Sequence, residues 1–188
     1  VPDYRLQQDA PFPAAYEDAM AAWLYLRGTG YAARDILLAG DSAGGGLALA
    51  LLAGVLAQDE RPAGLVAFSP WCDLTLSGAS IRANRARDVI IPAGRMQEAV
   101  DQYLAGADPA DRRASPLFAS FPGPPPVLIQ AGDTEVLLSD SQRMEERLRS
   151  AGGDVRLSIW RDVPHVWQFM AGHLPEGQAA LDEALATL

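Results

Sequence analysis

The chain has 188 residues, of which 49% are hydrophobic and 21% charged, a composition typical of one folded domain and not of a disordered chain. Its 15 basic residues, all arginine, stand against 24 acidic residues, and the net charge of −9 disfavours nucleic acid and anionic membrane surfaces as partners. The absence of lysine excludes a P-loop lysine, a Schiff-base lysine and a serine–lysine pair. The single cysteine, Cys72, excludes an internal disulfide and disfavours a zinc cluster.

Short apolar runs alternate with helical patterns along the chain. In chain order the patterns predict a helix over 16–27, a strand over 36–39, a buried helix over 43–58, a strand over 65–68, a helix over 92–104, a strand over 127–129, a helix over 138–149, a strand over 155–159 and a last helix over 176–188. The first three strands are continuous apolar runs, which are typical of parallel strands buried on both faces. In the fourth, Val155, Leu157 and Ile159 alternate with polar residues, as in a half-exposed strand near a sheet edge.

This alternation predicts an α/β fold with a mostly parallel sheet and helices on both faces, forming a single domain over 1–188. Residues 69–126 break the rhythm, because they contain one clear helix and no clear strand. We expect a lid or binding excursion at about 70–125. No apolar run approaches the roughly 18 residues of a membrane helix, and the start of the chain has no secretory signal design, so we expect a cytoplasmic protein without a membrane span.

Residues 40–44, Gly-Asp-Ser-Ala-Gly, match the G-x-S-x-G motif between a buried strand and a buried helix. A sharp strand-to-helix turn of this kind projects the serine above the sheet edge at a helix N-terminus. We therefore predict that Ser42 is a nucleophile of acyl transfer, and that the backbone N–H of Ala43 is one donor to the oxyanion.

A base and an acid should follow the nucleophile in the chain, in the order serine, acid, histidine. His165 lies in a loop shortly after the last predicted strand and is favoured as the base over His173, which we expect to be a surface or packing residue in an apolar helical stretch. Asp133 and Glu135 both follow the strand at 127–129 and both qualify as the acid. Because they are two residues apart in an extended loop, only one can meet the histidine. Asp140 begins a helix and is interpreted as a capping residue.

Together these residues resemble the bacterial branch of the hormone-sensitive lipase family of α/β-hydrolase esterases, and the resemblance covers essentially the whole chain. The resemblance implies that the acid is Glu135, because residues 135–137, Glu-Val-Leu, occupy the register of the family's Asp-Pro-Leu tripeptide; Asp133 is the second candidate. The matching segments are Asp3–Leu6, Pro11–Ala15, Glu17–Asp18, the nucleophile turn at Gly40–Gly45, Ser69–Trp71, Asp73–Thr75 and Pro164–His165.

The family also carries an upstream His-Gly-Gly-Gly segment, which completes the oxyanion hole, and a helical N-terminal cap. Neither is in this sequence, and Val1–Leu6 looks like the end of a strand. We therefore expect the C-terminal part of a larger α/β-hydrolase domain, with the remaining oxyanion donors and the first strands upstream of residue 1.

The resulting hypothesis is a serine carboxylesterase that uses Ser42, His165 and Glu135, acts on a small-molecule ester with a short acyl chain, and needs no cofactor and no metal. Trp71, Trp167 and Phe169 are candidates for the substrate pocket, and a homodimer is the assembly to consider. Two alternatives stay open: another acyl hydrolase (amidase, lactonase or thioesterase) with the same triad, and a non-catalytic ligand-binding member of the fold.

Overall fold

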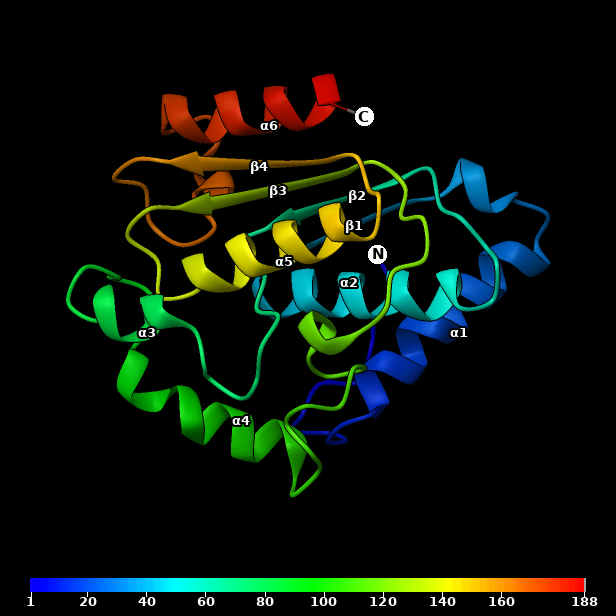
Figure 1. The fold of residues 1–188 in the computed structure, drawn as a ribbon, viewed down its shortest axis with the longest axis horizontal. Helices are drawn as coiled ribbons and strands as arrows, with labels where there is room; N and C mark the ends of the chain where they lie inside the picture. The colour runs from blue at the N-terminus through cyan, green and yellow to red at the C-terminus, as the bar shows by residue number, and fades with distance from the viewer. Residues whose placement is uncertain (188) are drawn as a thin grey trace.

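The computed structural model describes residues 1–187 and contains one parallel sheet with strand order β1-β2-β3-β4 (Figure 1). The strands are β1 (Leu37–Asp41), β2 (Gly64–Phe68), β3 (Val127–Gly132) and β4 (Val155–Trp160). Every neighbouring pair is parallel, so all strands end at the same edge of the sheet. The predicted α/β fold with a parallel sheet is confirmed, and the strand ends define the edge at which a site is expected.

Helices fill the intervals between the strands. They are α1 (Ala14–Gly28), α2 (Ser42–Leu56), α3 (Ala79–Ala83), α4 (Met96–Leu104), α5 (Leu138–Ser150) and α6 (Pro175–Thr187), with 3-10 turns at Ala33–Asp35, Ala93–Arg95, Pro116–Phe118 and Trp167–Met170. The helix predicted over 92–104 thus begins as a 3-10 turn. The short helix α3 was not predicted, because a single turn and a half leaves no readable periodicity. Residue 188, the predicted end of the last helix, lies outside the described residues.

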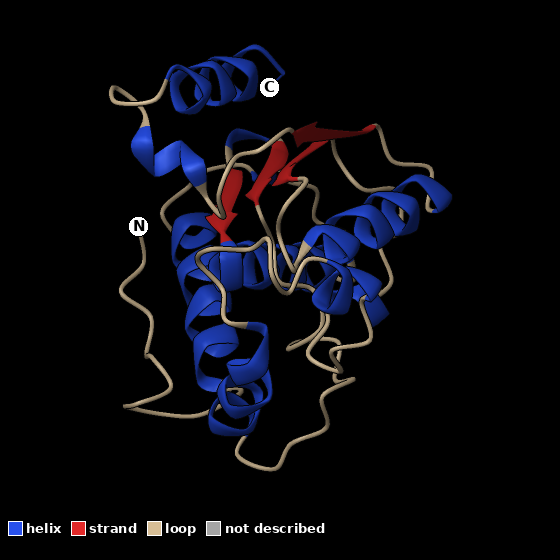
Figure 2. Ribbon diagram, turned by 90° about the vertical axis from the view of Figure 1, so that its left-hand side faces the viewer, coloured by secondary structure: helices blue, strands red, loops and turns tan. Residues whose placement is uncertain are grey.

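Helices lie on both faces of the sheet, as Figures 1 and 2 show from two directions. Helices α2 and α5 lie against one face, with α1 packed on α2, and α6 lies across the other. Side chains of successive residues in the central strands point to opposite faces of the sheet. Leu65 and Ala67 belong to the large core with α2, while Val66 packs with Ala184 of α6. The continuous apolar runs of β2 and β3 follow from this double cover.

The first strand differs from the expectation of burial on both faces. Leu38 is 8% exposed and packs in the core with α2, but Leu37 is 47% exposed. Helix α6 contacts the sheet at β3, away from β1, so the second face of β1 has no helix over it within the described residues. The prediction of an edge strand is confirmed for β4, which pairs only with β3 in the described sheet. The apolar side of its alternation is buried only in part, since Val155 is 5% exposed but Ile159 is 47% exposed.

Residues 70–125 contain α3 and α4 and no strand, and they lie on the α2 and α5 side of the sheet (Figure 1). The expectation of a strand end at Val1–Leu6 is wrong for this structure, in which residues 1–6 are not part of a strand. Instead the Arg5 backbone N–H and guanidinium donate to the Asp18 carboxylate at 2.7 to 2.9 Å. None of the helices within residues 1–187 combines the length and apolarity needed to cross a membrane.

Candidate active site

The Ser42 turn joins β1 directly to α2, because β1 ends at Asp41 and α2 begins at Ser42. Ser42 has a φ of 52°, in the left-handed region that non-glycine residues adopt only with strain. A Cβ atom at Gly40 would lie 2.3 Å from the carbonyl oxygen of Gly44, so the turn can close this tightly only with glycine at position 40. The Trp71 N–H donates to the Ser42 carbonyl at 2.9 Å and ties the turn to the end of β2.

The structure brings Ser42, His165 and Glu135 together from three separate parts of the chain. Ser42 Oγ lies 2.9 Å from His165 Nε2. On the other side of the ring, His165 Nδ1 lies 2.6 Å from Glu135 Oε2. The three side chains therefore form a continuous hydrogen-bonded series, with a hydroxyl at one end and a carboxylate at the other. This is the geometry that lets a histidine remove the hydroxyl proton while its ring is held by the carboxylate.

The Glu135 carboxylate is buried, with 0% exposure, and its second oxygen is also hydrogen-bonded. Oε1 accepts the Gly132 backbone N–H at 2.5 Å and the Ser69 hydroxyl at 2.7 Å. These donors stabilise the charged carboxylate where water cannot reach it. Ser69 was not predicted as a site residue. It follows β2 directly, so its place at the carboxyl end of a parallel strand was a signal that could have found it.

Asp133, the second candidate acid, does not contact His165. Its carboxylate accepts the Asp162 backbone N–H at 2.8 Å and pairs with the Arg87 guanidinium at 3.2 Å. The Asp162 hydrogen bond, with Arg87 beside it, holds the pKa of the Asp133 carboxyl below its ordinary value. Asp133 and Glu135 therefore point in different directions, as their spacing predicted, and Asp133 fastens the acid loop to the loop that carries His165.

Two further expectations concern His173 and Asp140. His173 is exposed and lies in a turn between the 3-10 turn at Trp167–Met170 and α6, so it is a surface residue but not a helical one. Asp140 does not cap α5, whose N-cap residue is Leu137. Its Oδ2 instead accepts the backbone N–H groups of Cys72 and Asp73, both at 2.9 Å. Burial raises the pKa of the Asp140 carboxyl to about 7.

The acid loop is also held by the first part of the 70–125 excursion. Asn84 Nδ2 donates to the carbonyls of Asp133 at 3.0 Å and Glu135 at 2.8 Å. Ser80 Oγ donates to the Val136 carbonyl at 2.6 Å. The sequence contains no signal for these contacts, since they link residues about 50 positions apart. Ser80 and Asn84, which precede α4 in the excursion, therefore hold the backbone of the loop that carries Glu135.

The N-terminus of α2 supplies the electrostatic environment next to Ser42. Ala43 lies in the first turn of α2, where backbone N–H groups have no carbonyl partner within the helix. The same end of the helix carries partial positive charge. The Ala43 N–H is therefore available to a developing oxyanion. Within residues 1–187, no group of three or more His, Cys, Asp or Glu side chains is arranged to hold a metal ion.

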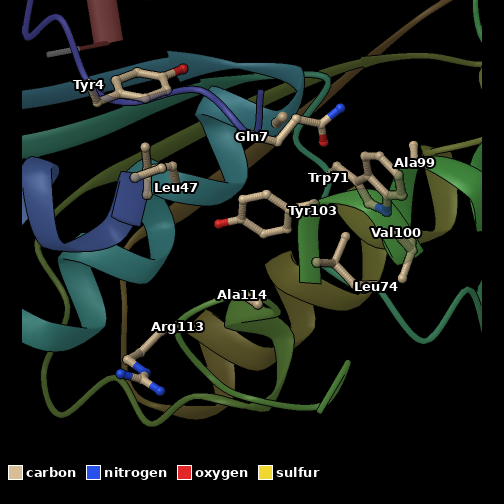
Figure 3. A pocket seen from close by; sticks show the side chains of 12 residues that line it. Tyr4, Gln7, Leu47, Trp71, Leu74, Ala99, Val100, Tyr103, Arg113 and Ala114 are labelled. Atoms are coloured by element: carbon tan, nitrogen blue, oxygen red, sulfur yellow. The ribbon is translucent and has the colours of Figure 1, made fainter. Parts of the chain in front are cut away.

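A pocket of about 140 Å³ opens beside Ala43 (Figure 3). Its walls come from the N-terminal segment, α1, α2, the loop after β2, α4 and residues 113–114. Tyr103 stands between the Leu47 and Trp71 side chains in Figure 3. Burial raises the pKa of the Tyr103 phenol to about 12, which keeps it neutral. The lining residues are Tyr4, Gln7, Ala15, Ala43, Leu47, Trp71, Leu74, Ala99, Val100, Tyr103, Arg113 and Ala114.

Of the three predicted pocket residues, only Trp71 lines this pocket. Trp167 has 0% exposure and packs with Val163, Ala180 and Trp160. Phe169 is 78% exposed and is not part of the pocket wall. Neither side chain reaches this pocket, because nearness to His165 in sequence does not fix the direction of a side chain beyond a turn with a left-handed residue, here Val166 with a φ of 52°.

A family model described as alpha/beta hydrolase fold matches residues 1–169. The chain is 41% identical over 186 residues to an acetyl-hydrolase of Streptomyces hygroscopicus, covering 98% of this chain and 62% of that protein. It is 35% identical over 181 residues to an esterase of Acinetobacter venetianus, covering 95% of this chain and 60% of that protein. The chain therefore spans about three fifths of the length of these relatives.

Solved structures agree with the sequence relatives. An esterase from the bacterial hormone-sensitive lipase family superposes with a TM-score of 0.92 at 42% identity, covering 96% of this chain and 61% of that one. The structure of EstE5 soaked with p-nitrophenyl butyrate superposes with a TM-score of 0.91 at 40% identity, with the same coverage of 96% and 61%. The chain belongs to the α/β-hydrolase fold family, in which it is similar to esterases of the bacterial hormone-sensitive lipase family.

Proposed function

We propose that this chain carries the nucleophile, base and acid of a carboxylesterase. The observation that carries the proposal is the series from Ser42 Oγ to His165 Nε2, at 2.9 Å, and from His165 Nδ1 to Glu135 Oε2, at 2.6 Å. The series begins on a left-handed serine at the N-terminus of a buried helix. The similar proteins, an acetyl-hydrolase and an esterase, support the same class of reaction.

In the proposed reaction Ser42 Oγ attacks the ester carbonyl while His165 Nε2 takes its proton. The negative charge on the former carbonyl oxygen is stabilised by the Ala43 N–H and by the positive end of α2. His165 then gives the proton to the leaving alcohol, and an acyl group remains on Ser42. Water, deprotonated by His165, attacks this acyl-enzyme and releases the carboxylic acid. Glu135 holds the ring and stabilises the imidazolium in both halves.

We also propose that the acyl group is short. The pocket beside Ala43 has a volume of about 140 Å³, well below the roughly 300 to 1,000 Å³ of pockets that bind drug-sized ligands. Leu47, Trp71 and Tyr103 make the pocket mostly apolar, as an acyl chain requires. Two similar proteins point to acyl groups of this size: one is an acetyl-hydrolase, and the other, EstE5, was soaked with p-nitrophenyl butyrate.

The test compares the complete protein with its Ser42→Ala variant on p-nitrophenyl butyrate, with a fluorophosphonate probe to label the nucleophile. We expect labelling at Ser42, and a loss of kcat of about 10⁴-fold or more in the variant, because losses of triad residues are of this order. Ser141→Ala is the matched control: the buried Ser141 hydroxyl has no hydrogen-bond partner among the described residues, and kcat should stay within about threefold.

Retention of a tenth of the wild-type kcat in Ser42→Ala would contradict the proposal. The butyryl p-nitroanilide, which has the same acyl group, separates an esterase from an amidase: we expect the ester to react and the anilide to remain intact. Labelling of Ser42 without turnover of any ester would instead favour the ligand-binding alternative.

A further inference from the structure

Ser69 occupies the position between the nucleophile turn and the acid loop. It follows β2 directly, and β2 lies between β1, which leads to Ser42, and β3, which leads to Glu135. Its backbone N–H donates to the Gln130 carbonyl of β3 at 2.7 Å. Ser69 has 0% exposure, so its hydroxyl has no contact with bulk water.

The backbone of Ser69 is in the left-handed region, with a φ of 49°. Seven non-glycine residues among those described share this conformation, and three of them meet at the triad: Ser69, and Ser42 and Val166, each with a φ of 52°. Glycine adopts it without steric cost, whereas serine does not. Backbone strain of this kind clusters at functional sites, where the side chain has a task that glycine could not perform. At position 69 the difference between serine and glycine is a hydroxymethyl group.

The Ser69 hydroxyl connects the acid to the histidine loop. It donates its proton to Glu135 Oε1 at 2.7 Å and accepts the backbone N–H of Val166, the residue after His165, at 3.3 Å. Oε1 also accepts the Gly132 N–H at 2.5 Å, so two donors hold one carboxylate oxygen and leave Oε2 facing His165 Nδ1. Glutamate has one more rotatable bond than aspartate, so its carboxylate needs this additional restraint.

We propose that Ser69 is a positioning residue of the triad, whose hydroxyl fixes the rotation of the Glu135 carboxylate and joins it to the backbone that carries His165. This inference rests on the proposed function for its effect on catalysis. Its structural content does not, because the orientation of the carboxylate can be followed at His165 Nδ1 without any substrate.

The experiment uses the complete protein and two variants, Ser69→Ala and Ser69→Gly. Alanine removes the hydroxyl and keeps the strained backbone; glycine removes both. The matched control is Ser115→Ala: the Ser115 hydroxyl is also buried and also makes two hydrogen bonds, donating to the Pro109 carbonyl at 2.7 Å and accepting the Leu74 N–H at 2.8 Å. Thermal unfolding of all variants shows whether a buried hydroxyl affects stability alone.

We expect both Ser69 variants to lose about ten- to hundredfold in kcat on p-nitrophenyl butyrate with KM unchanged, the effect of losing one hydrogen bond to a charged group. A carboxylate that turns away from Nδ1 stabilises the imidazolium less. The protonation midpoint of His165, read from the acid limb of kcat/KM and from the downfield Nδ1 proton resonance, should therefore fall by about half a pH unit or more. Ser115→Ala should leave this midpoint in place.

A wild-type kcat in Ser69→Gly, or a His165 midpoint that stays or rises in both Ser69 variants, would overturn the proposal, because the carboxylate would then be held without the hydroxyl. If the wild-type protein hydrolyses no ester, the proposed function fails by itself. The Nδ1 resonance still decides the role of Ser69 in that case.

Discussion

Replacing Glu135 by glutamine keeps the shape of the side chain but replaces the hydrogen-bond acceptor that faces His165 by a donor. Oε1 accepts hydrogen bonds from the Gly132 N–H at 2.5 Å and the Ser69 hydroxyl at 2.7 Å, so the amide oxygen of glutamine must take this position. Its NH₂ group then occupies the Oε2 position, 2.6 Å from His165 Nδ1. There it donates a hydrogen bond to Nδ1, where the carboxylate accepts one.

The exchange also changes the hydrogen bond between His165 and Ser42, because it changes which nitrogen of the imidazole carries the proton. When Nδ1 accepts a hydrogen bond, the proton of the neutral imidazole sits on Nε2, which faces Ser42 Oγ at 2.9 Å. A protonated Nε2 cannot take the serine proton. A wrong tautomer of this kind lowers kcat by about 10⁴-fold, equivalent to about 5.5 kcal/mol in the activation free energy. The fold should remain, because the amide oxygen still satisfies both donors.

Asp133→Asn is the matched control two residues away. The Asp133 side chain is 32% exposed and pairs with Arg87 at 3.2 Å, so the loss of its charge should change kcat by less than about threefold. Steady-state kinetics on p-nitrophenyl butyrate at pH 8 and thermal unfolding of both variants decide the matter. A Glu135→Gln variant that keeps more than a tenth of kcat, or a crippled and well-folded Asp133→Asn variant, would refute the assignment of the acid.

Three further predictions concern the pocket, the buried acid and the nucleophile turn. Tyr103→Ala removes the ring between Leu47 and Trp71 and so lengthens the pocket. The ratio of kcat/KM for octanoate esters to kcat/KM for butyrate esters should then rise by about tenfold or more, since each buried methylene contributes about 0.8 kcal/mol. An unchanged ratio would exclude Tyr103 as the residue that limits acyl chain length. The fold favours protonated Asp140, because burial raises its pKa from 3.8 to about 7, so its contribution to stability is present below pH 4 and is lost as the pH rises through 7. Asparagine resembles the protonated acid and does not titrate. Between pH 5 and pH 8 the free energy of unfolding, measured in denaturant, should therefore fall by about 3 kcal/mol more in the wild type than in Asp140→Asn. If the unfolding free energies of the two proteins change in parallel with pH, the prediction is contradicted. Gly44→Ala should fold with an unchanged or higher Tm, because a Cβ atom at position 44 would have only the Tyr4 hydroxyl near it, at 3.8 Å. A large fall in Tm would show that the second glycine of the motif is required for a reason other than steric room for a Cβ atom.

Local features of the sequence were sufficient to predict the strands and the tight turn that carries Ser42. The apolar runs around Leu38, Val66 and Leu128 predicted parallel strands, and their order along the chain is their order in the sheet. Ser42 was predictable because everything that shapes its turn lies in adjacent residues, from the end of β1 to the first turn of α2. Both inferences depend on interactions between near neighbours, which periodicity and motif spacing report directly.

Tertiary structure decided the relations between distant segments. Asp133 and Glu135 both followed β3, and only the packing of the acid loop against Ser69, Asn84 and the His165 loop turned Glu135 inward. The same holds for Trp167, which the sequence suggested for the pocket and which is buried away from it. The direction of a loop side chain is set by a few backbone torsions and by partners far away in the chain.

The sequence by itself therefore determined the class of fold and singled out Ser42 and His165, whose Oγ and Nε2 atoms lie 2.9 Å apart, because these follow from local turns and from the meeting of parallel strand ends at one edge. Local patterns left Asp133 and Glu135 open, and the family resemblance pointed to Glu135. The contacts that Glu135 makes with His165 and Ser69 span 30 and 66 positions of the chain. Such contacts form only when strand pairing has brought the loops together. The residues adjacent to a side chain in the sequence therefore do not predict which residues it contacts across the sheet edge.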